Sequence, residues 1–169
     1  MPSHQPATHA ASASQEPQDA LQLLTAEHRE VKAMFQQYDR LAEAGGRGDE
    51  RMLLASQICV ALTLHAQVEE EILYPAARTA LPHDEDIVDE AYVEHASAKS
   101  LVAQIKTMTS DQPLFDAKVK VLGEYIDHHV KEEEGELFPK LRRTALDLDA
   151  MGERIAQRKK QLMAMPEPS

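Results

Sequence analysis

Two stretches of the chain place a glutamate four residues after a histidine, the spacing that puts both side chains on one face of a helix. The first stretch holds His65 and Glu69, the second holds His129 and Glu133, and in both a proline follows ten residues after the histidine. Imidazole nitrogens and carboxylate oxygens together suit iron, manganese, zinc or copper. The repeat therefore predicts a metal site to which both stretches contribute.

A Glu-His pair precedes each stretch, with its histidine at His28 in the first copy and at His95 in the second, and in both copies a lysine follows four residues later. Such a repeat indicates a duplicated helical hairpin. In each half the first helix offers one histidine, and the second offers a histidine and a glutamate.

The elements that must position these residues are amphipathic helices. Little glycine and few aromatic residues favour an all-α protein, and 169 residues suffice for one domain with a full core. Apolar residues that recur every three or four positions predict helices at about residues 19–44, 50–79, 85–109, 114–143 and 147–163. We therefore expect an all-α fold, an antiparallel up-down-up-down four-helix bundle with an additional C-terminal helix. Pro75, which has no N–H for the helix, is expected to kink the second helix or to loosen its last turns.

Six polar residues occupy inward positions of the first four predicted helices, where core residues would be expected. His95 is flanked on its face by Ala91 and Ala98, which leaves room beside the imidazole. The fourth stripe also contains Tyr125 or Ile126. The six candidate ligands are His28, His65, Glu69, His95, His129 and Glu133.

A shared cation would explain this layer, because a buried carboxylate without a partner costs several kcal/mol. The only cysteine, Cys59, is expected to be a small apolar helix residue, so no thiolate is available for an iron–sulfur cluster. Calcium and magnesium prefer oxygen ligands throughout, and four histidines with two glutamates are too many for one tetrahedral zinc. Two ions bridged by both glutamates would have about four protein bonds each.

The alternative for one such pair is a surface ion pair or a core histidine, and one His-x-x-x-Glu pattern is a weak signal. Two copies in register outweigh this alternative. The neighbouring acidic residues are expected to form a solvated face, or else to orient the histidine N–H groups from outside. These residues are Glu70, Glu71, Glu132 and Glu134. His83 is expected in a surface loop, and His128 at the periphery.

Charge and composition limit the possible partners, the compartment and the domain organisation of the chain. A net charge of -11 argues against nucleic acid or an anionic membrane as partner. We find no secretory signal and no stretch of transmembrane length, so a cytoplasmic protein is expected. Residues 1–17, with His4 and His9, are expected to be a disordered tail, and residues 18–146 the bundle. Residues 147–169 are expected to form an amphipathic helix and a frayed tail. The chain is expected to be a monomer, or a homodimer formed through this C-terminal helix.

Over about residues 19–143 the chain resembles the hemerythrin-like, or HHE cation-binding, domains. The motifs that carry the resemblance are Glu27-His28, His65-x-x-x-Glu69 with Leu73-Tyr-Pro75, Glu94-His95, and His129-x-x-x-Glu133 with Leu137-Phe-Pro139. The resemblance implies a four-helix bundle with a non-haem di-iron centre that binds dioxygen or related small molecules. It implies the same six residues as ligands of two carboxylate-bridged iron ions, with zinc or manganese as substitutes.

The chain departs from the oxygen-carrying members at two places. They have a second histidine on the third helix, four residues from the first, where this chain has Ala91 and Lys99. They also have an aspartate five residues after the last histidine, where this chain has Glu134, so Glu134 is an alternative to Glu133. One iron is thus expected to have fewer histidine ligands than in the oxygen carriers.

Three functions are expected from these features. The first is a di-iron protein that binds or senses dioxygen, nitric oxide or peroxide, or that responds to iron. The second is an enzyme that decomposes hydrogen peroxide at the same centre, with Tyr38, Tyr74 or Tyr125 as accessory residues. The third is a metal-free helical interaction module that uses the fifth helix.

Overall fold

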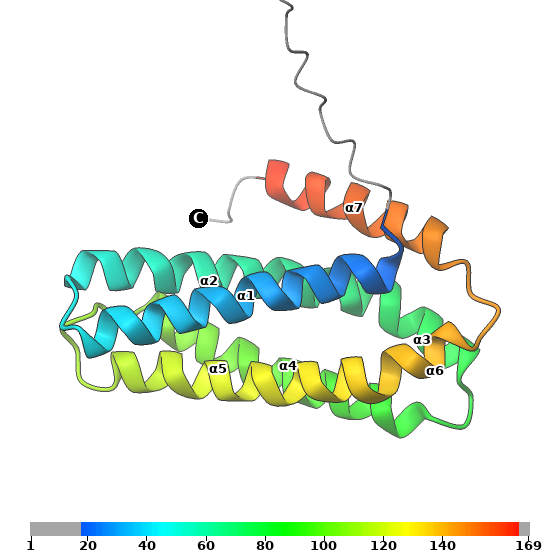
Figure 1. The fold of residues 1–169 in the computed structure, drawn as a ribbon, viewed down its shortest axis with the longest axis horizontal. Coiled ribbons are helices and arrows are strands. Elements are labelled where there is room, and N and C mark those ends of the chain that lie inside the picture. The colour runs from blue at the N-terminus through cyan, green and yellow to red at the C-terminus, as the bar shows by residue number, and fades with distance from the viewer. Residues whose placement is uncertain (1–17, 166–169) are drawn as a thin grey trace, which may run out of the picture.

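The structure is a computed structural model that describes residues 18–165, and within this range it contains helices and no strand (Figure 1). The elements are α1 (Ala20–Glu43), α2 (Gly48–Val68), η1 (Glu69–Leu73), α3 (Tyr74–Ala80), α4 (Glu85–Lys106), α5 (Phe115–Glu132), η2 (Glu133–Leu137), α6 (Phe138–Arg142) and α7 (Leu148–Ala164). The all-α prediction, with an additional C-terminal helix, is confirmed. The expected tail at residues 1–17, with His4 and His9, lies outside the described residues, as do residues 166–169, and the division into domains stays a prediction.

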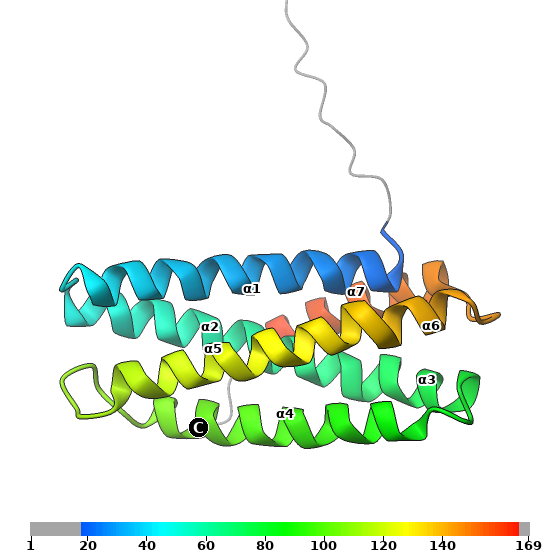
Figure 2. The ribbon, with the colours of Figure 1, turned by 60° about the horizontal axis from the view of Figure 1, so that its bottom comes forward.

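Four helical rods lie side by side along the long axis of the molecule (Figures 1 and 2). The first rod is α1 and the third is α4, whereas α2, η1 and α3 join into the second rod and α5, η2 and α6 into the fourth. The first rod packs against the second and fourth, and the third rod also packs against both. The inward faces of all four rods therefore meet in one interior.

The ends of the helices follow local chemistry. The Asp19 side chain accepts a hydrogen bond of 2.8 Å from the backbone N–H of Gln22, as expected for an N-cap. Gly45, with a φ of +65°, lies just beyond the end of α1. The third rod ends at Lys106, earlier than the predicted residue 109, because the hydroxyl of Thr107 donates to the carbonyl of Gln104 and competes with the helix.

Both long rods contain a π-helical turn that the sequence analysis did not predict. Of the two expectations for Pro75, the loosened helix is observed, as a widened turn, η1, in which the N–H of Tyr74 bonds to the carbonyl of Glu69. Proline cannot donate the regular helix hydrogen bond, and the extra residue in the turn adapts the hydrogen bonding of the helix to this missing donor. The fourth rod repeats this turn, and each turn begins at the glutamate of a His-x-x-x-Glu pair, Glu69 or Glu133.

The apolar core is divided in two by a polar layer. One cluster includes Leu24, Leu73 and Leu137, and the other includes Ile58 and Leu122. Along every rod, the inward histidine stands between residues of the first cluster and residues of the second. The buried polar residues thus form one layer that crosses the middle of the bundle.

The last helix, α7, packs across α1 and α2 (Figure 1). It buries Met151, Gly152 and Ile155, while Leu148 and Leu162 are partly buried against the same core cluster. The sequence left open whether this helix packs on the bundle or awaits a partner. In the structure its apolar side is covered by its own bundle.

By length and mean hydropathy, the helix Gly48–Ala80 is long and apolar enough to cross a membrane, contrary to the sequence-based expectation that no such stretch exists. Half of its most apolar window is buried inside the bundle. This helix packs against both α1 and α4, so its buried apolar residues belong to the core of the bundle.

Candidate metal centre

The six residues selected from the sequence meet in the buried layer, where none is more than 7% exposed. Their nitrogen and oxygen atoms form two groups, in each of which all ligand atoms lie within 4.8 Å of one another. One group is His28, His65, Glu69 and Glu133, and the other is Glu69, His95 and His129. The structure therefore brings together all six candidates, and their ligand atoms form two groups that share Glu69.

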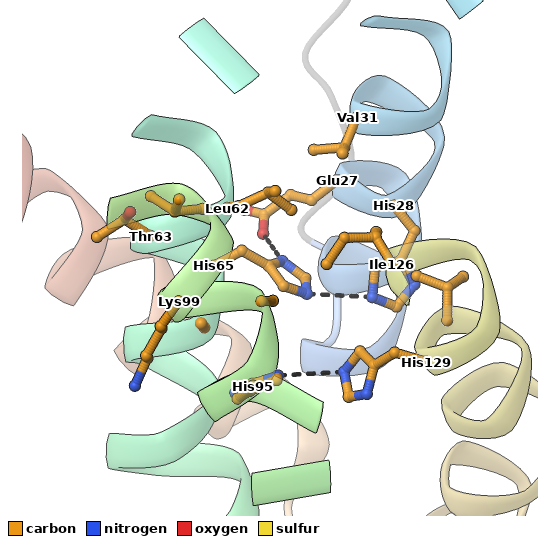
Figure 3. A pocket seen from close by; sticks show the side chains of 14 residues that line it. Glu27, His28, Val31, Leu62, Thr63, His65, His95, Lys99, Ile126 and His129 are labelled. Carbon is orange, nitrogen blue, oxygen red and sulfur yellow. Dashed lines mark hydrogen bonds and ion pairs between the residues drawn. The ribbon is translucent and has the colours of Figure 1, made fainter. Parts of the chain in front are cut away.

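Each half of the molecule contributes one pair of facing imidazoles (Figure 3). The Nε2 atoms of His28 and His65, from α1 and α2, are 3.1 Å apart. The Nε2 atoms of His95 and His129, from α4 and α5, are also 3.1 Å apart. Two nitrogen lone pairs thus converge on one point in each half.

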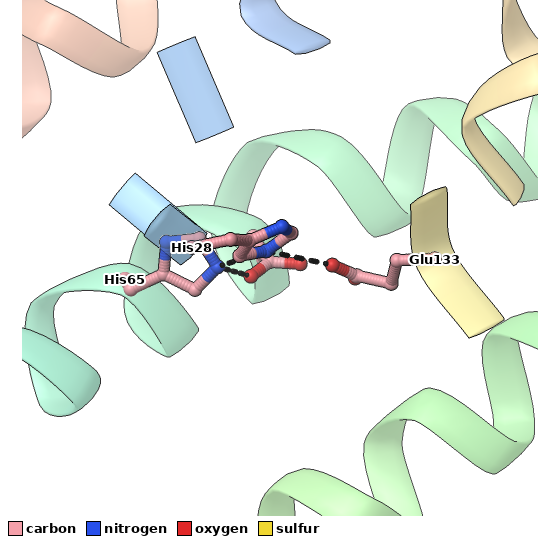
Figure 4. Close-up of side chains that lie close together, drawn as sticks. His28, His65 and Glu133 are labelled. Carbon is pink, nitrogen blue, oxygen red and sulfur yellow. Dashed lines mark hydrogen bonds and ion pairs between the residues drawn. The ribbon is translucent and has the colours of Figure 1, made fainter. Parts of the chain in front are cut away.

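The two glutamates stand between these pairs. Glu69 belongs to both groups of ligand atoms and also pairs with His65. Glu133 divides its oxygens between the halves. Its Oε2 lies 3.3 Å from Nε2 of His28 (Figure 4), and its Oε1 lies 3.4 Å from Nε2 of His129. Both carboxylates therefore lie within reach of histidines from both halves.

The metal-free layer leaves buried polar atoms unsatisfied, and this is the test of whether a cation fits. Both oxygens of Glu69 and Oε2 of Glu133 are buried without a hydrogen-bond partner. The ion pair between His65 and Glu69 does not remove the deficit, because its geometry is not that of a hydrogen bond. Each such atom costs about 1–3 kcal/mol, more when charged. Cations shared among these donors would satisfy all of them.

The outer nitrogen of every histidine in the layer faces a carboxylate. These contacts direct the Nε2 lone pairs toward the centre, as is typical of histidine ligands of metals. The Nδ1–carboxylate distances are 2.6 Å for His65 and Glu27, 2.9 Å for His95 and Glu70, 3.4 Å for His28 and Glu134, and 3.6 Å for His129 and Glu94.

Sequence reasoning only partly anticipated these outer carboxylates. Glu27 and Glu94 were noted as parts of the repeat but were not given a role, although their recurrence beside a histidine was the available signal. Of the two alternatives expected for the neighbouring acidic residues, Glu70 and Glu134 follow the second, because they contact the outer nitrogens of His95 and His28. The solvated face is the alternative that remains for the other two. It holds for Glu71, which pairs at the surface with Arg158, and for Glu132, which pairs there with His128.

The choice between Glu133 and Glu134 follows from burial. The Glu133 side chain is 2% exposed and its carboxylate lies inside the layer, whereas the Glu134 side chain is 37% exposed and reaches only the outer nitrogen of His28. The geometry therefore favours Glu133 as the candidate ligand.

The carboxylates determine the protonation of the layer. Burial alone would lower the pKa of His65, but Glu69 and Glu27 outweigh burial and raise it to about 10. Burial also opposes the charge on His129, yet Glu133 and Glu94 raise its pKa to about 11. At neutral pH the metal-free chain thus holds protons on these imidazoles, and a metal ion must displace them.

Tyr74 distinguishes the two halves of the layer. Its hydroxyl donates to Oε1 of Glu133 at 2.6 Å and lies 3.1 Å from Nε2 of His95. Burial, together with the charges of Glu69 and Glu133, raises the pKa of Tyr74 well above its usual value, so the phenol stays protonated. The equivalent residue of the other half is Phe138, whose ring stacks on His28 and offers no hydroxyl.

The other two tyrosines considered from the sequence lie away from the layer. Tyr38 donates a 2.5 Å hydrogen bond to Asp116 among the residues of the second core cluster, and Tyr125 is 47% exposed. Ile126, the alternative to Tyr125 on the fourth stripe, lies beside the layer and lines its cavity. Only Tyr74 of the three thus reaches the candidate metal centre.

A cavity of about 40 Å³ adjoins the four histidines (Figure 3). Its other walls are mainly apolar and include Val31, Leu62, Ala98, Val102 and Ile126. The space expected beside His95 is therefore present on the side of Ala98, whereas Ala91 is packed in the core. Since one water needs roughly 10–15 Å³ on this measure, the cavity admits a molecule of two or three heavy atoms.

Comparison with known proteins gives three findings. The family described as hemerythrin HHE cation binding domain matches residues 19–141. A DNA nickase of Nostoc sp. is 38% identical over 86 residues, which is 51% of this chain and 24% of that protein, so the chain spans about a quarter of this relative. An uncharacterized protein of Mycobacterium tuberculosis is 22% identical over 151 residues, covering 88% of this chain and 89% of that one.

Among solved structures, a hemerythrin HHE cation binding domain-containing protein from Mycobacterium kansasii superimposes with a TM-score of 0.69. The two chains are 20% identical, and the match covers 85% of this chain and 86% of the other. This likeness shows a shared helical fold.

Proposed function

The chain belongs to the hemerythrin HHE cation-binding domain family, and from this premise we propose that it is a non-haem di-iron protein with the up-down-up-down bundle that its sequence predicts. It binds or senses a small ligand such as dioxygen, nitric oxide or peroxide, or it responds to iron. The observation that carries this proposal is the buried layer of four histidines and two glutamates, whose carboxylate oxygens lack hydrogen-bond partners.

The donors divide naturally between two ions. His28 and His65 would hold one iron, His95 and His129 would hold the other, and Glu69, together with Glu133, would be shared. Zinc or manganese can substitute, because both accept imidazole and carboxylate ligands. When bound, two iron ions supply redox chemistry and positions open to a small ligand.

The residues around the layer support the binding of such a ligand. The apolar walls of the cavity exclude bulk water and restrict the ligand to a few atoms. The outer carboxylates, such as Glu27 on His65 and Glu70 on His95, hold the imidazoles in one orientation. Tyr74 keeps one proton at the centre, on the phenol oxygen that donates to Glu133.

Peroxide decomposition is the second candidate, and the position of Tyr74 favours it. The phenol of Tyr74, which donates to Glu133 and lies beside His95, could turn its one O–H from Glu133 to a peroxide oxygen, and it could do so in one half of the layer only. Steady oxygen evolution from hydrogen peroxide, lost in a Tyr74→Phe variant that keeps its metal, would support an enzyme. A single stoichiometric reaction would support a binding protein.

The metal-free interaction module has less support. The apolar side of α7, with Met151 and Ile155, is covered by α1 and α2, so a homodimer through this side would require the helix to leave the bundle. We therefore propose a monomer. Deletion of residues 147–169 that changes neither stability nor metal content, but abolishes self-association, would favour the module.

A cytoplasmic protein without a nucleic-acid or membrane partner completes the proposal. The name of the Nostoc relative raises DNA as a partner, but a net charge of -11 opposes contact with phosphates. Cys59 is a free, buried thiol, as expected in a reducing compartment. An electrophoretic shift of duplex DNA by the purified protein at 150 mM salt, about physiological strength, would contradict this part of the proposal.

Metal content tests the assignment of the ligands. Protein expressed with iron should lose iron in His65→Ala and in His129→Ala, whereas His83→Ala, at an exposed loop position, should retain the wild-type amount. Elemental analysis of the folded variants, checked by circular dichroism, gives the comparison. Full iron content in either layer variant would refute the role of that histidine.

A further inference from the structure

A second His-x-x-x-Glu pair stands on α5, one residue before the buried one. It consists of His128 and Glu132, whose Nε2 and Oε1 atoms are 3.1 Å apart. Both side chains face outward, since His128 is 68% exposed and Glu132 is 38% exposed. Glu94 approaches them from α4, and the ligand atoms of the three residues lie within 4.8 Å of one another.

A hollow in the surface accompanies this cluster. It has a volume of about 320 Å³ and is lined by Glu94, His128 and Glu132 together with Asp89, Glu90 and Val93. The space is sufficient for an ion with several waters. The cluster is therefore accessible from solvent, unlike the layer beneath it.

The inner edge of the cluster contains polar atoms without partners. Oε2 of Glu94 is buried and has no hydrogen bond, and it faces Nδ1 of His129 at 3.6 Å. His129 is 4% exposed, and its Nδ1 also lacks a hydrogen-bond partner. The Glu94 side chain is 23% exposed, but this oxygen is buried and weakly paired, so a cation beside it would stabilise the carboxylate.

The other half of the molecule shows what balances the equivalent carboxylate. Glu27 corresponds to Glu94 in the repeat, accepts from Nδ1 of His65 at 2.6 Å and also pairs with the ammonium group of Lys159 on α7. Among the described residues, no lysine or arginine pairs with Glu94 in this way.

The extra ligands occur only in the half that lacks the lysine. The positions of α2 that correspond to His128 and Glu132 are Leu64 and Val68, which cannot bind a cation. Beside the outer carboxylate of the first half, Glu27, the chain thus places the ammonium group of Lys159. Beside that of the second half, Glu94, it places two potential metal ligands, His128 and Glu132.

We propose that Glu94, His128 and Glu132 form a peripheral site for a divalent transition-metal cation, separate from the buried layer. One imidazole and two carboxylates suit zinc, manganese or ferrous iron. Three protein ligands leave positions for water, so the ion exchanges with solvent. Bound there, it holds Glu94 against His129 as Lys159 holds Glu27 against His65.

Zinc binding to iron-loaded protein tests this site, measured by competition with a chromophoric chelator. Wild-type protein should bind one zinc ion beyond the metal of the buried layer. His128→Ala and Glu132→Gln should each weaken that binding by about tenfold or more. His83→Ala and the double variant His4→Ala/His9→Ala are controls and should bind zinc as the wild type does.

Three results would overturn the site: no additional zinc in the wild type, unchanged affinity in both His128→Ala and Glu132→Gln, or loss of the zinc in the His4→Ala/His9→Ala variant. Both replaced residues of the site are exposed on a helix, so the fold tolerates the changes. Zinc-edge anomalous scattering from soaked crystals should place the ion in the hollow. A difference between wild type and His128→Ala reports this site whether or not the buried layer holds iron.

Discussion

Replacing Gly152 with alanine should loosen α7 and, through it, the candidate metal centre. A Cβ added at this position would lie 2.7 Å from the carbonyl oxygen of Gln18 and 2.9 Å from the backbone nitrogen of Ala20. Both contacts are closer than real Cβ atoms approach their neighbours, and both involve backbone atoms that cannot rotate away. The helix must therefore shift away from the start of α1.

The magnitude follows from two opposing effects. Overpacking a tight contact costs about 1–3 kcal/mol, whereas alanine in place of glycine favours a helix by up to about 1 kcal/mol. Gly135→Ala is the matched control, because a Cβ at Gly135 meets nothing within 4 Å. Both variants add a methyl group to a helical segment, Gly135 in the π turn η2 and Gly152 in α7, but only Gly152→Ala creates a clash, so Gly152→Ala should be the less stable by about 1–3 kcal/mol.

Guanidinium denaturation of the two variants, with and without iron, measures this difference. Gly152→Ala should also release iron faster, because Lys159 lies about two turns further along α7 and pairs with Glu27, the partner of His65. Equal stability of Gly152→Ala and Gly135→Ala would refute the docking of α7. Lower stability of Gly152→Ala with unchanged iron release would refute only the link to the metal centre.

Three further predictions concern the layer itself. Lys159→Met should lower the metal affinity about tenfold, measured by chelator competition, with the exposed Lys160→Met as control; equal affinities would contradict the link through α7. Tyr74→Phe should keep its metal content but lose about 1 kcal/mol of unfolding free energy with one hydrogen bond, and a loss of metal in this variant would show that the phenol helps to hold it. In the metal-free protein, His65 and His129 have pKa values raised to about 10 and about 11, so their stabilising contribution is complete below pH 6.5, the ordinary histidine pKa, and declines as pH rises toward 10. Urea denaturation between pH 6.5 and 10 should show this decline, and a flat or rising stability would contradict it.

The helical fold could be predicted from the sequence because apolar residues recur with the period of a helix. The two π turns could not, since the stripe of apolar residues continues through them and only Pro75 and Pro139 mark their place. The choice between Tyr125 and Ile126 was open for a related reason. The two side chains are about 100° apart on the helix, and packing against α1 decides which is buried.

The inward candidates could be predicted because a charged residue on an apolar stripe is conspicuous. Their outer partners could be predicted only as an alternative to a solvated face, because Glu70 and Glu134 stand at solvent-facing positions of their own helices. Each contacts a histidine of a different helix, His95 or His28, and the register between helices is not contained in the period of either one.

The metal content per chain of iron-loaded protein, with an absorption spectrum recorded in air, tests the central proposal most directly. Two irons per chain with near-ultraviolet charge-transfer bands would agree with a layer in which Glu69 and Glu133 are shared between two pairs of histidines. No metal, or one zinc per chain, would contradict the di-iron centre and move the interaction module to first place.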